Sequence, residues 1–185
     1  MAKPPATLVR TGQCVERCAA RLPELYRLAR ELCPDGFPAE ETRALEALRE
    51  HVSLAYASAL REEIAEKLAL DPGVLGLDLF SIHGCGPVSL HDDKFRYPGV
   101  YFVLVVAHSG QLGLVDQRSR AERHRVGEIV LLDPHRKHAL VPEGHRAREH
   151  PYERTHSPVL VAEDQFLFLD FDVKRSLLRA RFRAG

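Results

Sequence analysis

The sequence lacks the features that mark several common classes of protein. Its 26 Lys and Arg residues are balanced by 26 Asp and Glu residues, so no net charge attracts nucleic acid as an obligatory partner. No apolar run reaches the ~20 residues that a membrane span needs. The first residues, MAKPPATLVRTGQ, lack the apolar core of a secretory signal. We therefore expect a cytoplasmic protein with no membrane partner and no dedicated nucleic-acid partner.

Cysteine motifs are also missing. The four cysteines, Cys14, Cys18, Cys33 and Cys85, form no C-x-x-C pair, and their spacing matches no zinc-site pattern. We interpret them as reduced thiols that serve as small buried hydrophobic residues.

The hydrophobic pattern changes character near residue 73. Before it, apolar residues recur with a helical period, which predicts helices over 13–32 and 38–68. After it come short apolar segments separated by turn residues, which predict strands at 77–82, 88–90, 99–107, 111–116, 126–132, 139–141, 159–161 and 165–173. At 185 residues the chain is expected to form one compact domain, with a helical part over 1–73 packed on a β core over 74–185.

Helices followed by a series of strands predict an α+β fold. We expect a jelly-roll or cupin-like β core, the double-stranded β-helix, with the N-terminal helices packed on one sheet. The segment 99–107 is apolar throughout, so its strand should be buried on both faces.

The histidines point to a metal site. Nine of the ten histidines lie between His83 and His156, and only His51 lies outside this stretch. His91 and Asp93 are two residues apart at the end of a short strand, so their side chains should lie on the same side. With a distant histidine they make up the 2-His-1-carboxylate ligand set, which holds Fe(II) on one face and leaves the other face open.

The third ligand has two candidates in one segment. His138 directly precedes the strand 139–141, whereas His135 follows the corner at Asp133-Pro134. We prefer His138 for this reason, with His135 as the alternative.

These residues and their surroundings resemble the Fe(II)/2-oxoglutarate-dependent oxygenases. That family is characterised by His-x-Asp, apolar strands, and a second histidine about fifty residues later; here 47 residues separate His91 from His138. The resemblance covers about Leu77 to Val173. It implies a double-stranded β-helix, His91, Asp93 and His138 as ligands of iron, and oxidation of a substrate by O₂ with 2-oxoglutarate as co-substrate.

The resemblance also implies a basic residue for the distal carboxylate of 2-oxoglutarate. Arg148 lies ten residues after His138, the spacing typical of the family, and Arg146 is the alternative. The fork of an arginine matches a carboxylate with two hydrogen bonds. Both lie in HRAREHPYERTH, which does not have the apolar pattern of the strand where the family carries this arginine.

Three functions therefore remain open. The first is a dioxygenase (an oxidoreductase) that hydroxylates a small-molecule or protein substrate. The second is a cupin-like metalloenzyme that does not use 2-oxoglutarate, and the third is a jelly-roll binding module without catalysis. The sequence carries no motif that identifies the substrate or the oligomeric state.

Overall fold

A computed structural model describes residues 8–38, 42–76, 81–147 and 165–174 of the chain. Within these residues the strands are β1 (Leu8–Cys14), β2 (Thr42–Ala44), β3 (Ser81–Cys85), β4 (Val88–His91), β5 (Val100–His108), β6 (Leu112–Asp116), β7 (Glu128–Leu132), β8 (His138–Pro142) and β9 (Phe166–Lys174). The helices are α1 (Leu22–Leu32), α2 (Glu46–Arg49) and α3 (Leu54–Leu68), with 3-10 turns at Ala19–Arg21 and Pro72–Val74.

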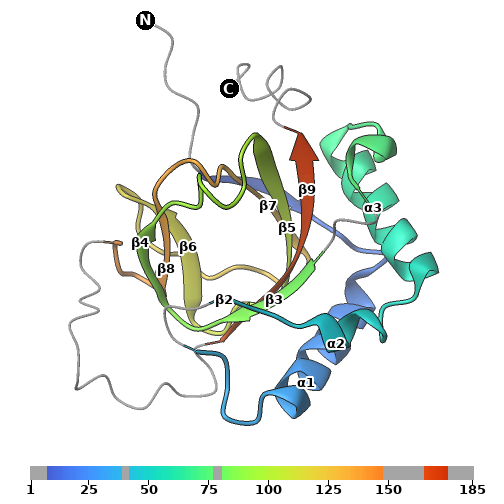
Figure 1. Cartoon of the computed structure of the whole chain (residues 1–185), viewed down its shortest axis with the longest axis horizontal. Helices are drawn as coiled ribbons and strands as arrows, with labels where there is room; N and C mark the ends of the chain where they lie inside the picture. The colour runs from blue at the N-terminus through green and yellow to red at the C-terminus, as the bar shows by residue number, and fades with distance from the viewer. Residues whose placement is uncertain (1–7, 39–41, 77–80, 148–164, 175–185) are drawn as a thin grey trace, which may run out of the picture.

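The strands form two sheets, as in a β-sandwich. The larger sheet has the order β1-β7-β5-β9-β3-β2, and the smaller has the order β4-β8-β6. All pairs between these strands are antiparallel. The helices lie on the outer face of the larger sheet, and the smaller sheet lies across its other face (Figure 1). The predicted mixed fold with helices packed on one sheet is therefore confirmed at this level.

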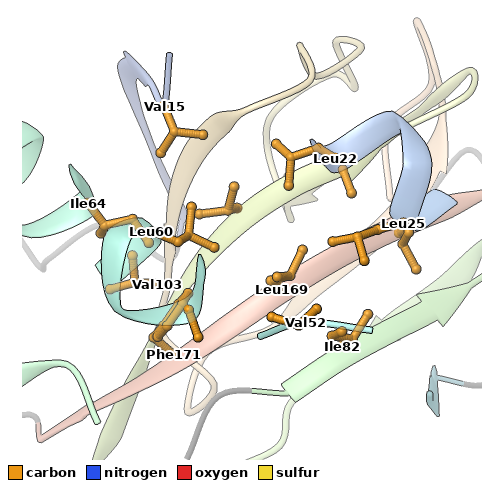
Figure 2. Close-up of a cluster of buried hydrophobic side chains, with 14 of the residues drawn as sticks. Val15, Leu22, Leu25, Val52, Leu60, Ile64, Ile82, Val103, Leu169 and Phe171 are labelled. Carbon is orange, nitrogen blue, oxygen red and sulfur yellow. The ribbon is translucent and has the colours of Figure 1, made fainter. Parts of the chain in front are cut away.

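The larger sheet separates two apolar cores because strand side chains alternate between its faces. On β5, Tyr101, Val103 and Val105 belong to the core under the helices, whereas Phe102 and Leu104 belong to the core between the sheets. The expectation that this strand is buried on both faces is correct. Figure 2 shows the helix side, where Leu22, Leu25, Leu60 and Ile64 meet Val103, Leu169 and Phe171 of the sheet.

The first predicted helix, over 13–32, is only partly correct. Residues 8–14 form β1, which pairs with β7, and the helix begins at Leu22, with Pro23 in its first turn. The backbone N–H groups between them bond elsewhere: that of Val15 donates to the Gly127 carbonyl, and those of Glu16 to Cys18 donate to the Glu63 carboxylate. Tertiary contacts thus take the donors that a longer helix would need.

The second predicted helix, over 38–68, is interrupted. Thr42–Ala44 pairs with β3 instead of continuing a helix. The long helix α3 starts only after Ser53, whose hydroxyl accepts the Tyr56 N–H, and it ends at Ala69 with a left-handed backbone (φ 48°). The first 73 residues therefore supply two strands of the larger sheet as well as the helices.

The predicted strands after residue 81 agree with the structure, with small shifts at their ends. The prediction of a strand at 159–161 and most of that at 77–82 lie outside the described residues. Among the helices of the described segments, none combines the length and the apolar character needed to cross a membrane.

Candidate metal centre

The predicted ligands lie at a cavity between the two sheets. The cavity has a volume of about 140 Å³. Because a water molecule needs roughly 10–15 Å³ by this measure, the space suits a small organic molecule. Its lining is mainly apolar and aromatic and comes from both sheets and from the turn before β5 (Cys85, Val88, Tyr97, Phe102, Leu104, Leu114, Leu132, Leu140, Phe166 and Phe168). The polar side chains are therefore a minority of the lining.

Strand pairing brings the two histidines together. His91 on β4 lies directly opposite His138 on β8, and their ring centroids are 4.3 Å apart. The Nδ1 atom of His91 is 2.7 Å from the Ser89 carbonyl oxygen, and that of His138 is 2.9 Å from the Arg136 carbonyl oxygen. A carbonyl can only accept, so Nδ1 carries the proton in each neutral ring. Both Nε2 atoms are left with a lone pair for a metal, the arrangement typical of metal-binding histidines.

Asp93 completes the group from the turn after β4. Its backbone N–H donates to the Pro134 carbonyl at 2.7 Å, which ties this turn to the segment before β8. Its Oδ2 lies 3.7 Å from Nε2 of His91 and 3.5 Å from Nε2 of His138. The prediction that His91 and Asp93 share a side, with Asp92 outside the group, agrees with this geometry.

The three donor atoms fit a single metal ion. They all lie within 4.8 Å of one another. Bonds of about 2.1 Å place neighbouring ligand atoms ~3 Å apart in an octahedron and ~3.4 Å apart in a tetrahedron, so adjustments below 1 Å suffice for both contacts of Asp93. His91, Asp93 and His138 could therefore bind a metal, as the spacing predicted.

The electrostatics of the group suit a cation. Burial, followed by the charge of His138, lowers the pKa of His91, which keeps the ring neutral and able to coordinate. Burial alone would raise the pKa of Asp93, but the hydrogen bond and charge that the protonated His138 ring supplies, with the charges of His91 and Arg96, lower it overall. The carboxylate is therefore ionised at neutral pH.

His135, the alternative ligand, has a different place. Its Nε2 is 3.0 Å from the Tyr97 carbonyl oxygen and 3.3 Å from the Gly99 nitrogen. It is not part of the three-residue group, and its contacts hold the turn that leads into β5.

Of the two arginines predicted to bind 2-oxoglutarate, only Arg146 belongs to the described residues. Arg146 is exposed, pairs through its backbone with Arg120, and does not line the cavity. Arg148 lies outside the described residues. Among the described residues, the Lys or Arg side chain that lines the cavity is Arg96, from the turn after Asp93, and the sequence reasoning missed it.

Two further polar residues of the lining were missed as well. His83 on β3 and Asp170 on β9 face the cavity from the larger sheet. Asp170 lies in the strand predicted at 165–173, where a charged residue at an inward position of an apolar strand was the available signal. His83 lies one residue past the end of the strand predicted at 77–82, so the sequence pattern did not place it on a strand.

Comparison with known proteins gives no family assignment. No protein-family model matches the sequence, and no curated protein matches it significantly.

Proposed function

We propose that this protein is a non-haem Fe(II) enzyme that oxidises a small organic substrate with O₂, using 2-oxoglutarate as co-substrate. The observation that carries the proposal is the meeting of two histidine Nε2 atoms and one carboxylate at the wall of an apolar cavity. A 2-His-1-carboxylate set occupies one face of the metal and leaves the opposite face free for co-substrate and O₂.

The order of the strands supports the proposal. From β3 to β9, successive strands alternate between the larger and the smaller sheet. This alternation is expected of a double-stranded β-helix, the fold implied by the resemblance to the 2-oxoglutarate oxygenases. In such a core the ends of β4 and β8 are the expected positions of the ligands, where His91 and His138 lie.

In the proposed reaction the protein binds and orients, and the iron supplies the activation of O₂. His91, Asp93 and His138 would hold the ion. Hydrogen bonds to backbone carbonyls orient the two histidine rings, and the backbone N–H of Asp93 fixes the position of its turn. The apolar lining excludes water. Arg96 would pair with a carboxylate of the co-substrate at the cavity. The oxygen atoms of O₂ end in succinate and in the hydroxylated substrate, and CO₂ is released.

A second candidate is a cupin-like metalloenzyme that does not use 2-oxoglutarate. The exposed position of Arg146 favours it, because this arginine does not line the cavity. The charges on β9 also favour it: Asp170 faces the cavity, whereas Lys174 is exposed at the last position of the strand. A carboxylate lining the cavity from that strand opposes the entry of a dianion.

The test starts from metal binding by the full chain. Protein loaded anaerobically with Fe(II) is dialysed and its metal content measured for the wild type, His91→Ala, Asp93→Ala and His138→Ala. We expect about one ion per wild-type chain and strong loss in each variant, with the circular-dichroism spectrum unchanged. Succinate is then assayed after 2-oxoglutarate and O₂ are added; slow uncoupled turnover would support the first candidate. Metal binding without any binding of 2-oxoglutarate would favour the cupin-like alternative, and absence of metal binding would refute both.

A further inference from the structure

A second polar group lies in the cavity, on the sheet opposite the metal ligands. Asp170 on β9 is 7% exposed, and its Oδ1 is 3.3 Å from Nε2 of His83 on β3. The contact is not aligned as a hydrogen bond: in the described part of the chain, Oδ1 of Asp170 and Nδ1 of His83 are buried without a hydrogen-bond partner. An unpaired buried polar atom is unfavourable, so a ligand that pairs with this group would be favoured.

Aromatic rings surround this group. The Phe168 ring stacks on His83 with centroids 5.4 Å apart, and Phe166 lies 5.4 Å from Phe168. Tyr97 and Phe102 meet edge to face at 4.7 Å on the same cavity. The faces of aromatic rings carry negative potential and attract organic cations. Rings beside a buried carboxylate are therefore suited to a positively charged group.

The charged residues of β9 also favour a positively charged ligand. Asp172 follows Asp170 on the same face of β9, and burial, followed by the charge of Asp170, raises the pKa of Asp172 to about 6. Among the described residues, the Lys or Arg side chain that lines the cavity is Arg96, which belongs to the turn after Asp93. The β9 wall thus combines negative charge with low polarity.

We propose that the cavity binds a small organic cation, an alkylammonium, with its charged nitrogen at Asp170 beside the Phe168 ring. Its hydrocarbon part would extend across the cavity toward His91, Asp93 and His138. The assignment of this cation as the substrate rests on the proposed function, but its binding at Asp170 does not. An amine substrate would thereby present its C–H bonds, and not its charge, to the metal.

Three probes of similar size and different charge test the proposal on the full-length protein without metal. Binding of n-butylammonium, 1-pentanol and pentanoate is measured by calorimetry or ligand-observed NMR. We expect the cation to bind at least tenfold more tightly than the alcohol, and pentanoate to bind most weakly. Pentanoate binding as tightly as n-butylammonium would overturn the proposal.

Variants locate the cation within the cavity. Asp170→Asn keeps the shape and removes the charge, and it should weaken n-butylammonium binding at least tenfold. The exposed Glu143→Gln is the matched control and should leave binding unchanged. Asp93→Asn should remove metal binding and keep ammonium binding, which separates this proposal from the metal hypothesis. Loss of ammonium binding in Asp93→Asn but not in Asp170→Asn would refute it.

Folding of the variants is checked by circular dichroism. If Asp170→Asn does not fold, Phe168→Leu takes its place, because it removes an aromatic face and keeps an apolar side chain. We expect Phe168→Leu to weaken the cation severalfold more than the alcohol. Equal weakening of both probes would show that the ring acts only through packing, and would contradict the proposal.

Discussion

Glu63 offers the sharpest test of how the helices are held on the sheet. This glutamate lies in the middle of α3 and is 1% exposed. Its Oε1 accepts the backbone N–H groups of Glu16 at 2.6 Å and Arg17 at 2.9 Å, and its Oε2 accepts that of Cys18 at 3.0 Å. One carboxylate thus links α3 to the segment between β1 and α1.

The expected cost of removing it follows from these three bonds. A buried donor left unpaired costs about 1–3 kcal/mol, and water can reach part of the site at Glu16 and Arg17. We therefore expect Glu63→Ala to lower the free energy of unfolding by roughly 3–6 kcal/mol. Glu63→Gln keeps one acceptor oxygen but turns an amide toward the Cys18 N–H, so about 1–3 kcal/mol is expected.

The effect should depend on pH in a defined direction. Burial alone would raise the pKa of Glu63, but the backbone N–H groups of Glu16, Arg17 and Cys18 lower it overall, below the ordinary value of 4.5. A carboxylate with a lowered pKa stabilises the folded state above its unfolded pKa, and this stabilisation is lost as the pH falls through the folded pKa. The difference between the wild type and Glu63→Gln should therefore be full at pH 7 and shrink below about pH 4.5.

Urea denaturation of each protein at several pH values measures these differences. The neighbouring Glu62→Gln is the matched control, because Glu62 is exposed on the same helix, and it should change stability by less than ~0.5 kcal/mol. A loss below 1 kcal/mol for Glu63→Ala, or a Glu63→Gln effect independent of pH, would refute the reasoning.

Three further predictions concern the cavity and its walls. Arg96→Ala should weaken 2-oxoglutarate binding to the iron-loaded protein severalfold, since Arg96 is exposed and an ion pair at an exposed side chain contributes about 0.2–1 kcal/mol. Calorimetry on Arg96→Ala and Arg148→Ala decides which arginine binds it, and equal affinity in both variants and the wild type would exclude both. Gly84→Ala should destabilise the fold by about 1–3 kcal/mol, because a Cβ there would lie 2.6 Å from the Phe37 ring; an unchanged urea midpoint would contradict this. Burial raises the pKa of the Cys85 thiol to about 12, so alkylation at pH 8 should modify it only after unfolding, and mass spectrometry of the native protein would detect any earlier reaction.

The sequence by itself determined the features that depend on local pattern. Strand alternation and turn residues located β4 to β8 closely, and the His-x-Asp spacing identified His91 and Asp93. The prediction for His91 succeeds because a side chain's direction on a strand follows from its position. Asp93 lies in the turn after β4, which its backbone N–H ties to the Pro134 carbonyl. His138, which was preferred over His135, is the histidine whose donor atom lies close to those of His91 and Asp93. It does so because His138 begins β8.

Tertiary structure decided what those patterns do not encode. Residues with helical periodicity at Thr42–Ala44 became a strand because β3 offered an unpaired edge, and the helix before Leu22 was cut short because Glu63 takes its donors. His83 and Asp170 meet only because β3 pairs with β9, which lies far along the chain. Contacts of this kind depend on which distant segments come together, and no short window of sequence carries that information.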